Sequence, residues 1–183
     1  MATNYRRRVL DGLVNVLGDT TTGFNAQLGA IAQIYDISPY EITWTLPSPN
    51  CVYGQLDDLG ARVSQLISFP GAILYTTTAL KENRVKFSTF SGLVIAIVDM
   101  VLRFRAKDDA DTVANQPDFS GDYEKHPDAA EDAMLAALTA GRHILSAQSV
   151  NWTEYKTSRS PVIDTGDGHI QRVTFTLGFE VHI

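Results

Sequence analysis

Residues 92–105 constrain the fold of this chain more than any other stretch. With a period of two, one set of positions is apolar throughout, whereas the other changes from apolar to polar after Ile97. Because alternate side chains of a strand point to opposite faces, the pattern predicts a long central strand with one face buried throughout and the other buried over its first half. A buried helix is the alternative, but the β-branched residues and Gly92 favour a strand. The fully apolar set is Val94, Ala96, Val98, Met100, Leu102 and Phe104.

Three amphipathic helices are predicted in the first part of the chain. Apolar side chains recur at helical spacing over residues 4–18, 24–35 and 54–68. Asn4 and Thr22 are the side chains that we expect to cap the first two helices. The helices therefore precede most of the strands in the sequence.

Three consecutive arginines, Arg6, Arg7 and Arg8, lie near the start of the first predicted helix. Positive charge at this position opposes the helix dipole, so it gains nothing from the helix itself. One interpretation is a solvated charged face. The other is that these arginines meet an acidic surface on a neighbouring chain.

After residue 70 the helical period gives way to alternation, which predicts a first group of strands. Residues 72–77 and 85–89 alternate on either side of a polar turn, as expected for a hairpin that breaks at Ser91–Gly92 before the central strand. A proline-rich segment ahead of this group has room for one short strand at 41–46.

Residues 106–127 are predicted to form a long acidic loop or arm. They lack periodicity and contain Pro117, Gly121 and Pro127 among many Asp residues. A connection of this length inside a compact domain is typically functional or disordered. A fourth helix is predicted over 128–147, because Pro127 precedes it and acidic side chains occupy its first turns, where the helix dipole favours them.

A second hairpin is predicted over residues 150–183. Its first strand kinks near Ser160–Pro161, and residues 164–168 form a turn rich in Asp and Gly. In the second strand, residues 172–183, every second residue is apolar, and the residues between them are polar or glycine. We therefore expect this strand to lie within the sheet.

Together these elements predict an α+β fold: a mostly antiparallel sheet with helices packed against it, a long acidic loop between the strand group and a helix, and a C-terminal hairpin. We expect residues 1–183 to form a single domain, since a chain of 183 residues can bury one sizeable core without metal or disulfides. The 44% of hydrophobic and 20% of charged residues are typical of a globular protein.

Composition argues against several other classes of protein. The single cysteine, Cys51, excludes an intrachain disulfide and offers no thiolate cluster for a metal. A net charge of −6 argues against a general nucleic-acid binder. Asp11, Gly12 and Asn15 interrupt the apolar run behind the basic N-terminus, so we expect no signal peptide. Residues 92–105 are too short and too charged to span a bilayer, so we expect no membrane contact and a reducing compartment.

No motif predicts a catalytic, cofactor or metal site. The acidic residues between 107 and 132 do not have the spacing of a calcium loop. Gly166–Gly168 precedes a strand rather than a helix, which indicates a hairpin turn rather than a phosphate-binding loop. Trp152 and Tyr155 lack the interleaved basic residues of a base-stacking surface, so we expect them to pack. The four histidines, His126, His143, His169 and His182, have no metal-ligand spacing.

The layout of the chain resembles a known family. Gly23–Leu28 follows a starting helix, Phe69–Ile73 opens the sheet after a helix, and Arg172–Leu177 forms a terminal strand beyond a long loop and one helix. In these features the sequence resembles, across most of residues 1–183, the tail-terminator and neck proteins of long-tailed bacteriophages. These are small α+β subunits that assemble as rings, typically hexameric, where the tail tube meets the head.

The resemblance implies a structural virion protein of the tail or neck, assembled in the host cytoplasm, and not an enzyme. Its partners would be further copies of itself in a ring, the tail tube protein, and neck or head-completion proteins. DNA would pass through the lumen without specific binding, and loop 106–127 would be an arm that orders against a neighbour. Two alternatives remain: a head-closure or minor tail protein, and a soluble enzyme or small-ligand binder whose polar groups converge only in the fold.

Overall fold

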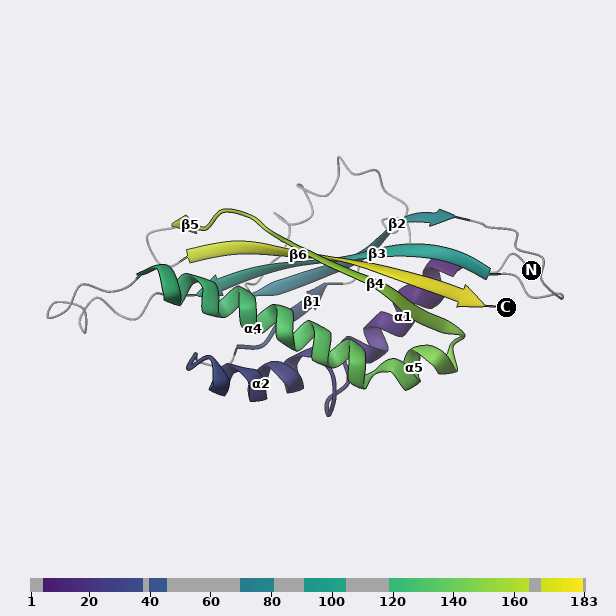
Figure 1. The fold of residues 1–183 in the computed structure, drawn as a ribbon, viewed down its shortest axis with the longest axis horizontal. Helices are drawn as coiled ribbons and strands as arrows, with labels where there is room; N and C mark the ends of the chain where they lie inside the picture. Colours follow the sequence, from purple (N-terminus) through teal and green to yellow (C-terminus); the bar gives the residue numbers. More distant parts are fainter. Residues whose placement is uncertain are drawn as a thin grey trace, which may run out of the picture.

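The computed structural model describes residues 5–37, 40–45, 70–80, 91–104, 119–164 and 169–182. These residues form an α+β fold in which helices pack against one face of a six-stranded, mostly antiparallel sheet, as predicted (Figure 1). The elements are α1 (Tyr5–Leu17), α2 (Phe24–Ile34), β1 (Thr43–Thr45), β2 (Gly71–Leu80), β3 (Ser91–Phe104), α4 (Phe119–Ala140), α5 (Arg142–Ala147), β4 (Val150–Arg159), β5 (Ile163–Asp164) and β6 (His169–His182).

The predicted central strand is β3, which lies between β2 and β6. The strand order is β1-β2-β3-β6-β4, with β5 paired beside the start of β6. β3 is antiparallel to both neighbours, and its pairing with β6 extends from Ser91↔His182 to Phe104↔His169. The predicted short strand at 41–46 is β1, which pairs parallel to β2. Residues 85–89, predicted as the second arm of the first hairpin, lie outside the described residues.

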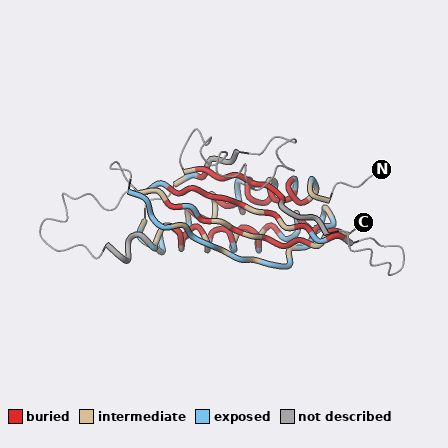
Figure 2. The backbone as a smooth tube through the Cα atoms, turned by 90° about the horizontal axis from the view of Figure 1, so that it is seen from above, coloured by how far each residue is buried: buried red, intermediate tan, exposed pale blue. Residues whose placement is uncertain are grey.

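One face of β3 is buried as predicted. Its five described side chains on that face are 0–1% exposed, and the side chain of Phe104 lies outside the described residues. Helices α1, α2, α4 and α5 contribute the opposing half of this core. The central strands are buried in Figure 2, whereas β4 runs exposed along one edge of the sheet. The buried face of β3 is formed by Val94, Ala96, Val98, Met100 and Leu102.

The prediction for the other face of β3 is wrong. Leu93, in the first half, is 37% exposed, whereas Asp99 and Val101, in the second half, are each 3% exposed. The burial follows the neighbouring strands, because Ile73 and Tyr75 of β2 form a second apolar cluster with Val101. Partner strands, and not the polarity of β3 itself, decide which half of this face is covered.

Helices α1 and α2 confirm the first two helical predictions, but the predicted cap of α2 is wrong. Gly23 is the N-cap and provides no side-chain hydrogen bond. The hydroxyl of Thr22 instead donates to Asp19 Oδ1 at 3.0 Å, within the turn that joins the two helices. Asn4 and the third predicted helix, residues 54–68, lie outside the described residues.

The acidic segment is shorter than predicted, because α4 already begins at Phe119. Residues 119–127 are therefore helical, Pro127 lies inside the helix, and the part of the predicted loop before residue 119 lies outside the described residues. The single helix predicted over 128–147 is divided at Gly141 into α4 and α5. A Cβ added at Gly141 would lie 2.4 Å from Val16 Cγ1, so the glycine permits close approach to α1.

The C-terminal hairpin is confirmed. β4 and β6 are antiparallel from Val150↔Val181 to Arg159↔Val173, with an irregularity between Trp152 and Glu154. The predicted kink near Ser160–Pro161 separates β4 from β5. Residues 165–168 of the predicted turn, and Ile183, lie outside the described residues. The hairpin thus places β6, the second central strand, between β3 and the edge strand.

Candidate functional site

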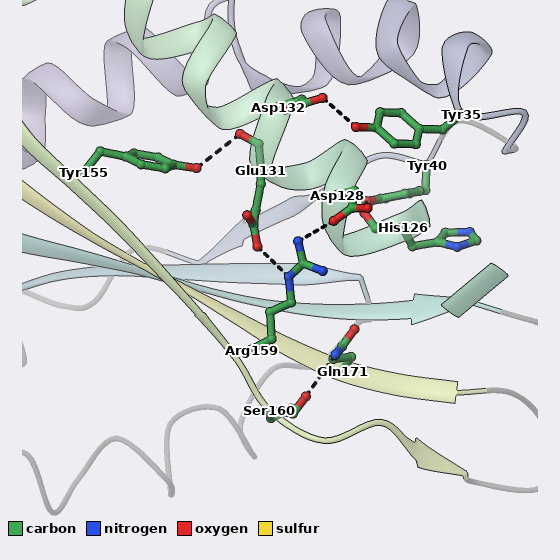
Figure 3. A network of polar contacts seen from close by, with 10 residues as sticks. All are labelled: Tyr35, Tyr40, His126, Asp128, Glu131, Asp132, Tyr155, Arg159, Ser160 and Gln171. Atoms are coloured by element: carbon green, nitrogen blue, oxygen red, sulfur yellow. Dashed lines mark hydrogen bonds and ion pairs between the residues drawn. The ribbon is translucent and has the colours of Figure 1, made fainter. Parts of the chain in front are cut away.

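The densest polar cluster among the described residues joins α4 to the edge strand β4. Register places Arg159 opposite the buried Val173, so its side chain emerges on the helix-covered face (Figure 3). Arg159 Nε donates to Glu131 Oε1 at 2.6 Å and Arg159 Nη2 donates to Asp128 Oδ1 at 2.5 Å. One guanidinium therefore holds two carboxylates that lie about one turn apart on α4.

Three tyrosines extend this cluster, one from β4 and two from the chain at the end of α2 and just after it. Tyr155 on β4 donates to the carbonyl of Glu131 at 3.2 Å, and Tyr35, after α2, donates to Asp132 Oδ2 at 2.7 Å. Tyr40 donates to the carbonyl of His126 at 3.2 Å, and its ring stacks on His126 with centroids 6.0 Å apart. These contacts connect α4 to the chain on both sides of it.

The electrostatics of the cluster favour a structural clasp. The hydrogen bond to Glu131 raises the pKa of Arg159, and the hydrogen bond to Asp132 raises the pKa of Tyr35 to about 12. Burial raises the pKa of Tyr40 and of Tyr155. Each shift moves a pKa away from neutrality, so the arginine stays charged and the tyrosines stay protonated near pH 7. Acid–base catalysis needs the opposite tuning.

An open groove adjoins the clasp where α4 faces the beginning of β6. Its volume is about 550 Å³. In its wall Gln171 Nε2 donates to the carbonyl of Ser160 at 2.9 Å, which fixes the orientation of the amide. The buried Gln171 Oε1 has no hydrogen-bond partner among the described residues. An unsatisfied buried acceptor costs about 1–3 kcal/mol. The groove is lined by Glu124, Pro127, Arg159, Val162, Asp164, His169 and Gln171.

A second open cavity, of about 670 Å³, lies at the opposite end of the sheet between α1 and the residues after α5. Arg8 and Asp11 line its α1 side, and Gln148 and Ser149 line the other. Arg7 and Asp11 form an exposed ion pair of 3.6 Å on the same helix. Basic side chains therefore gather where α1 begins.

The four histidines do not converge. His126 stacks on Tyr40, His143 has Nδ1 3.0 Å from the carbonyl of Ala140, and His182 Nε2 lies 3.8 Å from Glu180. Only His169 lines the groove beside the clasp. Within the described ranges, no group of three or more His, Cys, Asp or Glu is placed to hold a metal ion. Cys51 lies outside those ranges.

Trp152 and Tyr155 pack against the core, as the sequence predicted. Their rings meet edge to face with centroids 6.2 Å apart, and Tyr155 continues to Phe175 at 6.1 Å. Arg142 lies over the Trp152 ring at 5.8 Å. These aromatic rings help to hold the edge strand on the sheet.

Sequence reasoning missed two polar groups. Arg159 was not predicted to meet Asp128 and Glu131, since nothing in the local pattern pairs residues 28 or 31 positions apart. Asp99 was predicted on a wet half-face, yet it is buried and accepts hydrogen bonds from Tyr75 and Thr174. The one sequence signal for the burial of Asp99 was its position as a single carboxylate within an otherwise apolar strand.

No protein-family model matches the sequence, and no curated protein matches it significantly. Among the described residues, no helix is both long enough and apolar enough to cross a membrane.

Proposed function

We propose that the protein is a structural subunit of a long-tailed phage, a tail-terminator ring component that caps the tail tube and joins it to the head or neck. The proposal rests on the family resemblance of the layout. The observation that carries it furthest is the long antiparallel pairing of β3 with β6, which builds an extended plate with helices on one face. Such a plate is suited to hold the contact surfaces of a subunit at fixed positions relative to one another.

The role of such a subunit is geometric. The clasp around Arg159 joins α4 to the edge strand β4 and so links the helical layer to the plate. At the open edge, β4 pairs only with β6 among the described strands, which leaves room for contacts along that side. Identical subunits that bury unlike surfaces against each other form a closed ring when the rotation between them closes.

The negative net charge suits a protein that surrounds DNA without binding it. Specific and non-specific DNA binding both depend on Lys and Arg that displace counterions from phosphates. With a net charge of −6, a ring of this chain would let DNA slide through its lumen. Its expected partners are the tail tube protein and neck or head-completion proteins.

The oligomeric state provides the first test. Light scattering and negative-stain images of the full chain, alone and with tail tubes, are expected to show a discrete ring. A chain that stays monomeric when tail tubes are present would contradict the proposal.

Virus particles that lack this protein provide the second test. Full heads beside unjoined or overlong tails are expected for a tail terminator. Leaking heads would instead identify a head-closure protein, the first alternative. For the second alternative, a small-ligand binder, the groove beside the clasp brings His169 together with the carboxylates of Glu124 and Asp164. This meeting of one histidine and two carboxylates in one groove is the observation that favours the second alternative.

A further inference from the structure

The edge strand β4 has a row of backbone hydrogen-bonding groups that points away from the sheet. Among the described strands, β4 pairs with β6 alone. Just beyond β4 the N–H of Ser160 donates to the carbonyl of Arg172 at 2.9 Å, which makes these residues a hydrogen-bonded pair in the same register. Such pairs alternate with non-hydrogen-bonded ones along an antiparallel ladder, so the backbone groups of Tyr155, Thr157 and Arg159 point away from β6. They form a template for a further strand.

β4 carries one acidic and one basic side chain two positions apart. A Cβ added at Gly178 would lie 2.8 Å from the Cβ of Glu154, so these two positions share a face of the sheet. Gly178 lies between Leu177 and Phe179, which are buried in the core beneath the helices, so the shared face is the one away from the helices. Lys156 lies on this face too, because alternate residues of a strand share a side. Glu154 and Lys156 form an ion pair of 2.7 Å, and their side chains are 51% and 71% exposed.

This order of charges is complementary to itself in an antiparallel partner. When two copies of β4 pair about a two-fold axis at Tyr155, Glu154 of each copy lies opposite Lys156 of the other. The backbone groups of Tyr155 point outward, as the centre of such a pair requires. A partner shifted by two residues would bring two Lys156 or two Glu154 side chains together, and an in-register parallel partner would do so at both positions. The charges therefore favour one orientation and one register.

We propose that the outer edge of β4 binds the same edge of a second copy of the chain, antiparallel and centred on Tyr155. The contact is isologous, because both copies contribute the same surface. It goes beyond the proposed function, since a ring closes through heterologous contacts, whereas this contact relates two copies by a two-fold axis.

Two features of β4 limit the length of the contact and select its partner. The irregularity between Trp152 and Glu154 leaves Thr153 out of register with β6, and such a bulge interrupts pairing at an edge. Residues 154–156 lie beyond the bulge in both copies, so the central pairs are regular. A lysine at an edge commonly discourages pairing, but here Lys156 meets Glu154 of the second copy. The edge thus accepts a strand of reversed charge order and disfavours others.

α4 places an apolar side chain beside the same edge. Tyr155 donates to the carbonyl of Glu131, and Leu135 lies one turn further along that side of the helix. Leu135 is 43% exposed, whereas Met134 next to it is fully buried. In the paired form Leu135 of each copy lies near the two-fold axis, so the helical layer adds apolar area to the backbone ladder.

Charge reversal within β4 tests the contact. Glu154→Lys and Lys156→Glu each give a strand with two like charges, which meet like charges in a second copy. The double variant with both changes reverses the order and is again complementary to itself. The matched control is Arg7→Glu, because Arg7 also belongs to an exposed ion pair and its side chain is 77% exposed. Sedimentation velocity of the full chain over a concentration series measures pairing, with circular dichroism as the check on folding.

Each single variant is expected to pair at least tenfold more weakly than the wild type, whereas Arg7→Glu and the double variant pair as the wild type does. An equimolar mixture of the two single variants is expected to regain pairing, because each lysine then faces a glutamate. Single variants that pair normally, a double variant that does not pair, or a mixture that stays monomeric overturns the contact. A wild type that is monomeric throughout the concentration series overturns it as well, and assembly in the presence of tail tubes tests the ring function separately.

Discussion

The two faces of the sheet are buried by different means. On the helix-covered face, the buried side chains of β3 and β6 are apolar except for Gln171 near the start of β6, and Val98 and Phe175 are both 0% exposed. On the opposite face the buried set includes a carboxylate, Asp99, which accepts a hydrogen bond from Tyr75 at 3.0 Å and another from Thr174. The core of the helix-covered face is thus apolar, whereas the buried set of the opposite face contains a directed polar contact at its centre.

The two faces therefore contribute different things: the helix-covered face stabilises the sheet, and the opposite face fixes the register of its strands. Burial of apolar area is non-directional, so the helix-covered face stabilises any alignment that keeps apolar side chains inside. Asp99 accepts only from donors in the right positions, and its two donors come from β2 and β6 on either side of β3. A one-residue slip of β3 would turn this carboxylate into the apolar core. The polar face therefore specifies the alignment that the apolar face stabilises.

The largest expected effect lies on the apolar face. Phe175→Ala removes a fully buried ring and leaves a cavity between the sheet and the helices, which is expected to lower the free energy of unfolding by about 3–5 kcal/mol. Urea denaturation measures the change. A loss below about 1 kcal/mol would show that this face is loosely packed.

On the polar face, Asp99→Ala is expected to lower the free energy of unfolding by about 1–3 kcal/mol, because it leaves the hydroxyls of Tyr75 and Thr174 without their acceptor. Asp99→Asn, which keeps one acceptor oxygen, is the matched control and should lose less. Equal losses for the two variants would mean that the hydrogen bonds do not contribute.

Packing of the helical layer is tested with two glycines. Gly141→Ala places a methyl group 2.4 Å from Val16 Cγ1 and is expected to destabilise the fold by about 1–3 kcal/mol. Gly29→Ala, inside α2 with nothing within 4 Å of the added carbon, is expected to stabilise it by about 0.5–1 kcal/mol. Thermal melts of both variants provide the measurement. The same sign for both would contradict the close approach of α1 and Gly141.

The smallest effect concerns alkaline pH. The pKa of Tyr35 is raised from 10.0 to about 12 by its hydrogen bond to Asp132, so the folded state holds a proton that the unfolded state releases. Stability from this contact is complete below pH 10 and is lost as the pH rises toward about 12. Tyrosinate absorbance during titration should show Tyr35 ionising late in the wild type and near its ordinary pKa in Asp132→Asn. On the polar face, burial and the nearby Asp99 raise the pKa of Tyr75. We therefore expect Tyr75 to stay protonated to a higher pH than Tyr35.

The sequence predicts an element well when the cause of its structure lies within its own residues. The alternation of residues 92–105 and 172–183 predicted β3 and β6, because a single strand carries its own two-face pattern. The start of α4 was missed, since Pro127 and the acidic residues before it indicate a loop when judged alone. The structure instead extends the helix past the proline, where Tyr40 donates to the carbonyl of His126.

The candidate site was less predictable than the fold. Arg159 meets Asp128 and Glu131 only after α4 folds back across the sheet, and Asp99 is buried only because β2 and β6 are its neighbours. Such contacts depend on topology, which composition and period do not encode. The arginine triplet was visible in the sequence, whereas the groove beside the clasp emerged only from the fold.

The position of β6 has a consequence for synthesis. Among the described strands it comes last in the sequence, yet it separates β3 from β4 and pairs with both. Until residues 169–182 leave the ribosome, β3 lacks a partner along one side and β4 lacks the one described strand with which it pairs. Closing the sheet is therefore a late, long-range event. A chain that ends before β6 would leave one edge of β3 and of β4 unpaired, and unpaired strand edges promote aggregation.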